Sequence, residues 1–322
     1  MQKLIVKKEE SGQTLEKYVR KSFKDMPLSL IYKLFRKKDI KVNGHWQDAK
    51  YIVNEGDQIT IYISDEQLSS FTEVKEITPS NELEPLIVYE DENVLIVNKP
   101  RGVLVQPDSK NSHSLDKMVI SYLMYKDEYD PNSLGYKPGP AHRLDRNTSG
   151  LVIFGKNTFT LKYLSDILKD HQLVTKHYYT LVVGEIKEDG VINTPLKKDE
   201  NNNKVYVSSL SDGGKEAKTM YHVLDVFNNF TLLDVTLLTG RTHQIRVHMA
   251  SINHPVVGDS KYGDFKINRE FEKKYGFTNQ FLQAYELDFH KVDGPLIKLK
   301  NQNIVVDLDK EYLNVLNKLR SV

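Results

Sequence analysis

The chain has 322 residues, of which 39% are hydrophobic and 28% are charged, and its formal net charge is +1. This length suits one large or two ordinary domains, and no apolar run approaches the roughly 18 residues that a membrane-spanning helix needs. The chain contains no cysteine, which excludes disulfides, thiolate catalysis and Cys-ligated zinc. Because the first residues also lack the apolar core of a signal peptide, we expect a cytoplasmic protein.

Charge is distributed unevenly along the first part of the chain. Residues 17–42 contain nine basic and two acidic side chains, whereas residues 65–92 contain nine acidic side chains and one lysine. This asymmetry is typical of a basic module that faces RNA or a membrane surface and is followed by an acidic linker. A solvated helix face would carry a similar run, so charge alone leaves both interpretations open.

Two amphipathic helices are expected near the N-terminus. Leu15, Val19 and Phe23 recur at helical spacing, and Pro27 interrupts that pattern. The next apolar face predicts a second helix over residues 29–38, with Ser29 as its N-cap.

A hairpin and a final strand follow these helices. Residues 40–49 predict a strand, an Asn43-Gly44 turn and a returning strand, and residues 56–63 predict an alternating strand. This order resembles the small α/β RNA-binding domain named after ribosomal protein S-four, over residues 12–64. The resemblance implies that basic residues around the second helix contact RNA: Lys33, Arg36, Lys37 and Lys38.

The remaining chain predicts a linker and a larger domain, so we expect domains at 1–64 and 85–322. Residues 65–84 have no clear periodicity and are rich in acidic, Ser and Thr residues, as linkers are. Beyond them many short apolar strands recur, and helices are expected only near residues 114–126, 159–169 and 314–319. Such a pattern indicates an α+β domain with a mixed, mostly antiparallel sheet flanked by helices and loops.

The segment HRLDRNTSGLVIFGKN, residues 142–157, combines a charged loop with an apolar strand. Residues 151–154 form a short apolar run between two glycines, which predicts a buried strand. Asp145 lies between two arginines before that strand. It is either part of a solvated ion pair or a carboxylate kept ionised at an active site.

A second charged residue lies in an apolar context. Arg246, in the segment GRTHQIRVH, has Ile245 and Val247 beside it, in an element that could be a strand or a helix. A buried guanidinium is costly without a carboxylate partner, and Asp145 is a candidate for that partner. A structural ion pair unrelated to chemistry would leave the same pattern.

Histidines raise the question of a metal site, namely His142, His243, His248 and His254. Two of them, His243 and His248, are five residues apart, which suits neither one helix face nor one strand face. The usual phosphate-binding, nucleophile-elbow and HExxH motifs are absent from the sequence. We therefore predict no metal site and no nucleotide cofactor.

Five segments in order resemble the RluA-type pseudouridine synthases, which isomerise chosen uridines in structured RNA. They span about residues 85–290 and read VNKPRGVLVQP, HRLDRNTSGLVIFGK, KHYYTLVVG, LLTGRTHQIRVHMASINHPVVGDSKYG and LQAYELDFH. The small N-terminal domain is a common attachment in this family. Members of the family often have His at the positions of Gln106 and Gln283. These two departures bear on the assignment of the chain to a sub-group of the family, not on the implied activity.

The resemblance implies a role for individual residues. Asp145 matches the nucleophile, and Arg246 matches the arginine that pairs with it; a two-point contact between them would keep the carboxylate ionised and oriented. Tyr178 matches the tyrosine that stacks on the flipped uracil, and Arg143 matches the arginine that replaces the target base in the RNA. Further RNA contacts are expected from the neighbouring His142 and Arg241.

The implied reaction needs no cofactor, because it exchanges one ribose–uracil bond for another. The carboxylate either attacks the ribose or removes a sugar proton to give a glycal, and the sequence leaves both routes open. The expected partner is structured RNA, with large-subunit ribosomal RNA ahead of transfer RNA, and we expect a monomer without a membrane partner. A non-catalytic RNA-binding assembly factor, and a hydrolase that uses His142 or His243 with Asp145, remain alternatives.

Overall fold

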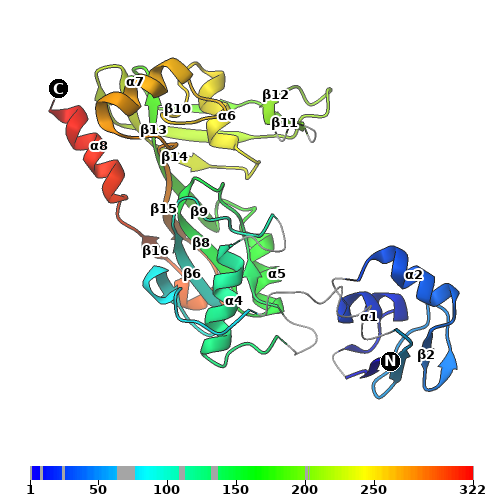
Figure 1. The fold of residues 1–322 in the computed structure, drawn as a ribbon. Helices are drawn as coiled ribbons and strands as arrows, with labels where there is room; N and C mark the ends of the chain where they lie inside the picture. The colour runs from blue at the N-terminus through cyan, green and yellow to red at the C-terminus, as the bar shows by residue number, and fades with distance from the viewer. Residues whose placement is uncertain are drawn as a thin grey trace. The chain divides into compact units, whose positions relative to one another are not determined.

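The chain forms two compact units, shown in Figure 1. The computed structural model describes residues 2–7, 10–23, 26–63, 77–108, 113–131, 137–199, 202 and 204–321. The first unit comprises Met1–Pro79 with Leu123–Lys137, and the second comprises Ser80–Tyr122 with Pro138–Val322. Most of the expected linker at 65–84 lies outside the described residues, so the boundaries expected at 64 and 85 stay predictions.

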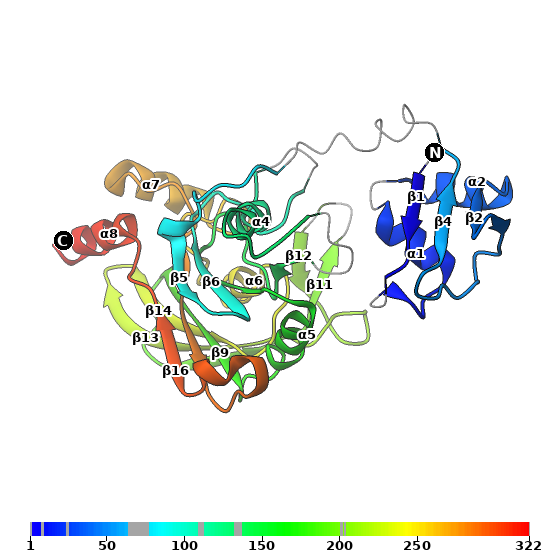
Figure 2. The same cartoon turned by 90° about the horizontal axis from the view of Figure 1, so that it is seen from below.

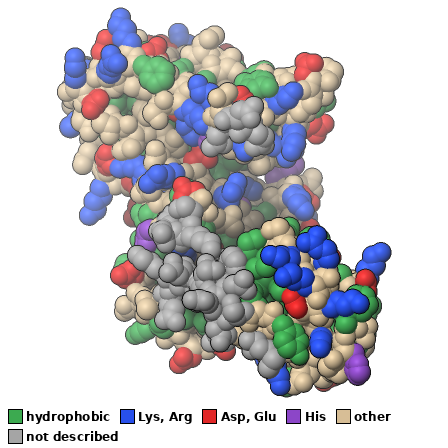
Figure 3. Space-filling model, turned by 45° about the vertical axis from the view of Figure 1, so that its right-hand side comes forward, with side chains coloured by type: hydrophobic (Ala, Val, Ile, Leu, Met, Phe, Trp, Pro, Cys, Tyr) green, Lys and Arg blue, Asp and Glu red, His purple; other side chains and the backbone are tan. Residues whose placement is uncertain are grey.

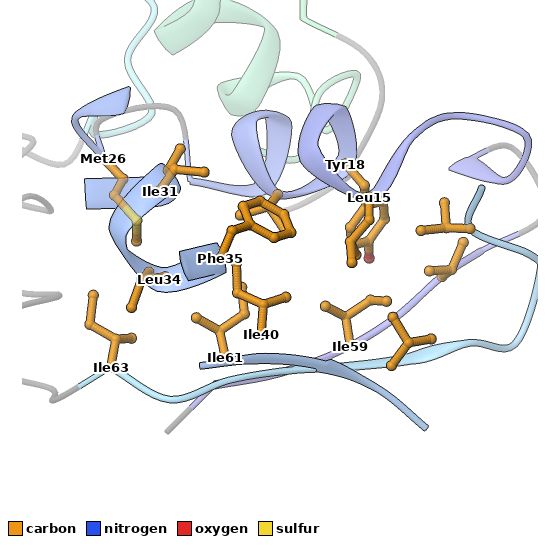
Figure 4. Close-up of a cluster of buried hydrophobic side chains, with 14 residues drawn as sticks. Leu15, Tyr18, Met26, Ile31, Leu34, Phe35, Ile40, Ile59, Ile61 and Ile63 are labelled. Atoms are coloured by element: carbon orange, nitrogen blue, oxygen red, sulfur yellow. The ribbon is translucent and has the colours of Figure 1, made fainter. Parts of the chain in front are cut away.

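The first unit has a four-stranded antiparallel sheet with the strand order β1-β4-β2-β3. The strands are β1 (Gln2–Ile5), β2 (Ile40–Val42), β3 (His45–Trp46) and β4 (Gln58–Ile61). Two helices, α1 (Leu15–Ser22) and α2 (Leu28–Arg36), cover one face of the sheet, as Figure 4 shows. Strand β1 was not expected from the sequence.

The core of this unit lies between the helices and the sheet (Figure 4). It contains Leu15 and Tyr18 from α1, Ile31 and Phe35 from α2, and Ile59 from β4, all of them buried. Because these apolar side chains face inward, the basic side chains at 33 and 36–38 are left exposed.

The second helix differs from the expectation at both ends. It starts at Leu28 with Pro27 as N-cap, so Ser29 lies inside the first turn and the prediction of Ser29 as N-cap is wrong. Proline can precede a helix directly because its φ is already near the helical value. The helix ends at Arg36, and the next two basic residues follow it, with Lys38 at a φ of +61°.

The expected Asn43-Gly44 turn is confirmed. Both residues have positive φ, +51° and +81°. This is the conformation that the tightest hairpin turns require and that Asn-Gly adopts most readily. The turn sets Val42 opposite His45 and so fixes the register of β2 and β3.

The second unit is built on a ten-stranded mixed sheet. Eight strands follow the order β10-β13-β14-β9-β15-β8-β6-β5, while β16 pairs with β15 and β7 with β8. Among the described strands of this sheet, β15 and β8 form the one parallel pair. This confirms the expected mixed, mostly antiparallel sheet. The strands are β5 (Ile87–Glu90), β6 (Val94–Lys99), β7 (Gly139–Pro140), β8 (Ser149–Gly155), β9 (Val174–Val183), β10 (Gly190–Asn193), β13 (Lys218–Phe227), β14 (Phe230–Leu237), β15 (Leu282–Phe289) and β16 (Gln302–Val305).

Helices and a separate hairpin complete the second unit. The helices are α4 (Leu115–Tyr125), α5 (Thr158–Ile167), α6 (Gln244–Ser251), α7 (Phe265–Tyr275) and α8 (Lys310–Arg320), with short 3₁₀ turns η2 (Glu84–Leu86) and η3 (Gly294–Leu299). The hairpin consists of β11 (Leu196–Asp199) and β12 (Lys204–Val207). The predictions for α4, α5 and α8 are confirmed, although the division between the units cuts the last turn of α4. Helix α7 was missed, despite its readable N-cap at Asp264 and its terminal Gly276.

The centre of the sheet brings the distant sequence motifs together. Strand β8 runs beside β15, with Gly150 opposite Ala284, and Ala284 in turn lies opposite Tyr178 on β9. Helix α6 packs against β12 and β13, and Figure 2 shows it beside the sheet and the β11–β12 hairpin. Leu144 and Ile245 belong to the same apolar cluster as Tyr178. The loop before β8, strand β9 and helix α6 therefore meet at one place.

The parallel contact of β8 with β15 predicts a strict requirement for glycine at position 150. A Cβ there would overlap the backbone carbonyl of Ala284, and the alanine would sit at a φ of +111°. We expect Gly150→Ala to lower the free energy of unfolding of this unit by roughly 3 kcal/mol or more, combining overpacking with an unfavourable φ. Gly240→Ala is the control, because a Cβ at Gly240 meets nothing within 4 Å. Urea unfolding measures both, and equal stabilities would contradict the register described.

Candidate active site

A tight loop between β7 and β8 carries Asp145. At its start, the backbone N–H of Ile153 donates to Nε2 of His142 at 3.2 Å. Burial lowers the pKa of His142 to about 3, so this ring is neutral and can accept that hydrogen bond. At its end, the N–H of Thr148 donates to the carbonyl of Asp145 at 3.1 Å. The side chain of Asp145, which is 24% exposed, is thus held on a loop fixed at both ends.

Lys99 joins this loop to the turn that follows β6. The side chain is fully buried, and its ammonium donates at 2.9–3.1 Å to three backbone carbonyls, those of Pro100, Val103 and Arg146. Burial lowers the pKa of Lys99 to about 7, while the carboxylates of Asp145 and Asp309 act in the opposite direction. The sequence shows Lys99 only within Lys-Pro-Arg-Gly, and that pattern does not distinguish a buried lysine from an exposed one.

Arg246 lies between two carboxylates. Its Nη1 donates to Oδ2 of Asp145 at 2.7 Å, while Nε and Nη2 donate to the two oxygens of Asp259 at 2.6 and 2.9 Å. Asp259 is completely buried, and only 8% of the Arg246 side chain is exposed. The expected ion pair of Arg246 with Asp145 is therefore present, but the two-point contact is made with Asp259.

The expectation that Arg246 orients Asp145 through both arms of its guanidinium is thus wrong. The fork faces Asp259 because that carboxylate is already fixed by the backbone N–H groups of Lys261 and Tyr262, at 2.8 and 3.1 Å. Asp259 was missed, although it lies in the quoted segment HPVVGDSKYG. A lone aspartate after glycine carries no signal that it will be buried beside an arginine thirteen residues earlier.

The three charged groups support one another electrostatically. Burial disfavours the ionised form of Asp259, but the hydrogen bonds and charge of Arg246 outweigh it and lower the pKa of this carboxyl. Burial likewise disfavours the guanidinium, and the two carboxylates overcome it, raising the pKa of Arg246 above its ordinary value. The site therefore holds a permanent cation against Oδ2 of Asp145.

Tyr178 lies on the same side of the sheet as the Asp145 loop. It is 5% exposed and packs in one apolar cluster with Leu144 and Ile245. Burial, together with the negative charge of Asp145, raises the pKa of Tyr178. The phenol is thus neutral at physiological pH and offers an aromatic ring beside the carboxylate.

His243 also reaches the carboxylate. It is the N-cap residue of α6, and its Nε2 lies 3.9 Å from Oδ2 of Asp145. Its Nδ1 lies 2.8 Å from the hydroxyl of Tyr262, a residue that the sequence did not single out.

The other histidines do not converge on a shared point. His248 binds the hydroxyl of Thr219 and the carbonyl of Thr194, and His254 binds the carbonyl of Val183. Within the described ranges, no group of three or more His, Asp or Glu side chains is arranged to hold a metal ion. In those same ranges, no helix has the length and apolar composition to cross a membrane.

The residues expected to contact RNA lie on the surface. Arg143 is exposed two residues before Asp145. Arg241 is exposed as well, and its Nε donates to the carbonyl of Glu216 at 2.8 Å. The four basic residues around α2 belong to the first unit, and His142 has a structural partner in β8. Their contacts with RNA stay predictions.

Gln283, one of the two departures from the family pattern, anchors the segment before α8. Its side chain is fully buried, donates to the carbonyl of Asp307 and accepts from the N–H of Asp309, at 2.8 and 2.9 Å. The hydroxyl of Ser149 on β8 donates to the carboxylate of Asp309 at 2.6 Å. The C-terminal segment is thereby fixed to the two strands that adjoin the site.

Taken together, these side chains can support attack by a carboxylate. Among the described residues Oδ1 of Asp145 has no hydrogen-bond partner, while Oδ2 is bound to Arg246. An ionised, partly exposed carboxylate with one free oxygen is suited to act as a nucleophile or as a base. The neutral ring of Tyr178, on β9, lies near this carboxylate, and Arg143 is exposed on the loop that carries it.

Comparisons with known proteins agree with this chemistry. Residues 93–251 match the family model described as RNA pseudouridylate synthase. The chain is 31% identical to ribosomal large subunit pseudouridine synthase C of Vibrio parahaemolyticus, over 93% of this chain and 94% of that protein. It is 33% identical to ribosomal large subunit pseudouridine synthase D of Buchnera aphidicola, over 87% of both chains.

A solved structure shows the same fold. Human RNA pseudouridylate synthase domain containing 4 superposes with a TM-score of 0.59 and 22% sequence identity, over 74% of this chain and 94% of that one. The sequence relatives extend over both units of the present chain. Sequence and fold lead to the same conclusion: the chain belongs to the RNA pseudouridylate synthase family.

Proposed function

We propose that this protein converts specific uridines of large-subunit ribosomal RNA to pseudouridine, with Asp145 as the reacting carboxylate. The observation that carries the proposal is the contact of Oδ2 of Asp145 with Arg246, which leaves Oδ1 free on a partly exposed loop. The ribosomal substrate is supported by the relatives from Vibrio and Buchnera, which are named for the ribosomal large subunit.

The reaction proceeds by exchange of one bond to the ribose. The bond from the sugar to uracil N1 breaks, the uracil turns, and the sugar bonds to carbon five, which finally loses its proton while N1 gains one. Asp145 assists the cleavage in one of two ways. It attacks the sugar carbon that carried N1, and the bond so formed breaks when carbon five bonds to that carbon. Alternatively it removes a proton from the neighbouring sugar carbon to give a glycal, and that proton is returned to the same carbon when carbon five bonds to the sugar. In either route Arg246 holds the carboxylate through the hydrogen bond from its Nη1 to Oδ2.

The target uridine must leave its stack before Asp145 can reach the sugar. Unstacking costs a few kcal/mol, and stacking of the base on an aromatic ring returns roughly 1–3 kcal/mol. Tyr178 is the ring available beside the carboxylate. To Arg143, exposed on the same loop as Asp145, we assign the filling of the vacated position in the RNA.

The first unit supplies a second RNA contact in this proposal, as an S-four-type domain. Figure 3 shows Lys and Arg side chains on the visible face of this unit, at the lower right. Two lysines lie over exposed aromatic rings, Lys38 at 5.0 Å from Trp46 and Lys41 at 5.1 Å from Tyr62. Cations beside exposed rings are suited to contact phosphates and bases together.

Two alternatives to this proposal can be distinguished from it: a hydrolase that uses His142, and the same reaction on transfer RNA. His142 accepts a hydrogen bond from the sheet backbone, which argues against its use as the base of a hydrolase. Mapping pseudouridines in cells that lack this protein distinguishes ribosomal from transfer RNA, since only the true target loses its modification. A monomeric state and a cytoplasmic location stay predictions.

The role of Asp145 is tested by Asp145→Asn. The amide keeps the shape of the side chain but cannot act as nucleophile or base, so we expect no detectable turnover. RNA binding should persist, because phosphate contacts lie elsewhere. Tritium release from RNA labelled at uracil carbon five measures turnover, and filter binding measures affinity. Asp166→Asn, on the exposed surface of α5, is the control and should retain full activity. Tritium release by Asp145→Asn near the wild-type rate would refute the mechanism.

Asp259→Asn tests the contribution of the buried Arg246–Asp259 ion pair, which holds the arginine that contacts Asp145. Removing one partner of a buried ion pair costs about 3–5 kcal/mol, so we expect that loss of unfolding free energy together with slower turnover. Because folding lowers the pKa of Asp259, its stabilisation is present above the ordinary carboxyl pKa of 3.8 and is lost as the pH falls through the lower folded value. The stabilities of wild type and variant should therefore converge at acidic pH. A difference independent of pH would show that this charge does not stabilise the fold.

The RNA contact of the first unit is tested by replacing Lys33, Arg36, Lys37 and Lys38 together by Gln. Each lost phosphate contact should reduce the slope of log affinity against log salt by roughly 0.7–0.9. The control neutralises four exposed basic residues of α7: Lys266, Arg269, Lys273 and Lys274. We expect a clearly larger change for the first variant. If the slopes of log affinity against log salt are equal for the wild type and that variant, these four residues of the first unit do not contact the RNA.

A further inference from the structure

His243 has an unusual backbone conformation next to the reacting carboxylate. Its φ and ψ are 53° and 21°, the left-handed region that side chains other than glycine seldom adopt. As the N-cap of α6 it makes no capping hydrogen bond with its side chain, which is 12% exposed and turned to Asp145 and Tyr262. Unfavourable backbone conformations persist where the surrounding structure requires them, often at functional sites.

A chain of hydrogen bonds determines which ring nitrogen of His243 carries the proton. The backbone N–H of Val205, on β12, donates to the hydroxyl oxygen of Tyr262 at 2.9 Å. That oxygen lies 2.8 Å from Nδ1 of His243. Since a backbone N–H can only donate, the oxygen of Tyr262 accepts from Val205 and its own proton is available to His243. The oxygen of Tyr262 could accept a second hydrogen bond from Nδ1, but its own proton would then have no acceptor among the described residues, and a bare Nε2 would face the carboxylate of Asp145. The arrangement that satisfies the hydroxyl, the ring and the carboxylate together has Nδ1 as the acceptor and, in a neutral ring, the proton on Nε2.

Nε2 is the nitrogen that faces the carboxylate. It lies 3.9 Å from Oδ2 of Asp145, the same oxygen that accepts from Arg246. A separation shorter by about 1 Å in the complex with RNA would make this contact a hydrogen bond, since catalytic hydrogen bonds are often long before the substrate binds. Tyr262 also lies against Arg246, whose guanidinium carbon is 5.1 Å from the centre of the ring. Both groups that flank Oδ2 therefore rest on Tyr262.

The charges around His243 keep its ring neutral. Burial lowers its pKa, the cations Arg246 and Lys261 act in the same direction, and the carboxylates of Asp145 and Asp259 oppose them. Tyr262 adds no charge, because burial raises its pKa. A neutral donor can align Asp145 without a second full positive charge, which would make the carboxylate a weaker nucleophile and base.

We propose that His243 is a positioning residue for Asp145, held by the Val205–Tyr262 chain as the neutral tautomer with its proton on Nε2. This rests on the proposed function of Asp145 as the reacting carboxylate. His243 acts by donating to Oδ2, so that Arg246 and His243 together fix the plane of the carboxylate and direct Oδ1 to the sugar. The hydroxyl of Tyr262 is required because without it either ring nitrogen could carry the proton.

The tautomer can be measured on the wild-type protein without RNA. A long-range proton–nitrogen NMR spectrum distinguishes a protonated from an unprotonated imidazole nitrogen, and comparison with His243→Gln assigns the resonance among the ten histidines. We expect Nε2–H and bare Nδ1 at pH 7, and an altered pattern in Tyr262→Phe. A charged ring, or a proton on Nδ1 in the wild type, would overturn the proposal even if the enzyme is active.

Kinetics test the consequence for Asp145. We expect Tyr262→Phe and His243→Asn to lower kcat about tenfold to a hundredfold with little change in KM, since misplacement of a reacting group has effects of this size. His243→Gln should be less impaired, because its amide can donate near the position of Nε2. In Tyr262→Phe the imidazole of His243 loses the hydroxyl donor that favours its neutral form, so the pKa of His243 should rise. The acid limb of the pH profile of kcat should therefore move to higher pH.

Tyr206→Phe is the control for the loss of a hydroxyl, because Tyr206 is exposed on the same β12 strand. It should match the wild type in kcat and in pH profile. Wild-type values of kcat and an unmoved acid limb in Tyr262→Phe and His243→Asn would contradict the positioning role. Absence of tritium release from the wild type would instead refute the proposed function, and the NMR result would still decide the tautomer.

Discussion

The arrangement of the site depends on one buried guanidinium between two carboxylates. Arg246 is almost entirely buried, and Asp259, which is completely buried, compensates its charge by accepting two of its hydrogen bonds. Because Nε and Nη2 of Arg246 are bound to Asp259, its Nη1 can donate to Asp145, and the arginine keeps a partner for its charge if that one hydrogen bond breaks. Asp145 is consequently free to change its partners during a reaction, whereas the arginine stays fixed.

The loop that carries Asp145 is held from several elements of the sheet. Lys99 binds the carbonyl of Arg146 from the end of β6, and Ile153 on β8 binds His142. Ser149 reaches Asp309, immediately before α8, so the C-terminal segment also adjoins this loop. The role proposed for Asp145 requires such support, since a displacement of a reacting group by about 1 Å lowers rates by about a hundredfold. The parallel pairing of β15 with β8 sets the start of β15, at Gln283, beside the start of β8, at Ser149, so that both residues reach the segment before α8.

The features that could be predicted from the sequence are those determined by residues close together in the chain. Short apolar runs indicated the central strands, the Asn43-Gly44 pair indicated its hairpin, and the apolar neighbours of Arg246 indicated a buried ion pair. Ser29 misled because proline can begin a helix without a polar cap. Asp259 and Tyr262 were missed because their importance arises only when α6 meets the segment that follows it. Pairing over such distances leaves no periodic trace in one sequence.

Contacts between distant residues also determine how Asp145 can be both ionised and reactive. A carboxylate that reacts with a sugar must be ionised, yet every cation that keeps it ionised also makes it less nucleophilic. Here the charge of Arg246 is shared with Asp259, and the nearest further donor, His243, sits where burial keeps it neutral. In the mechanism that we propose, Asp145 is oriented by Arg246 and His243, of which only Arg246 is charged. This balance depends on contacts between distant residues, so it becomes visible only once the chain is folded.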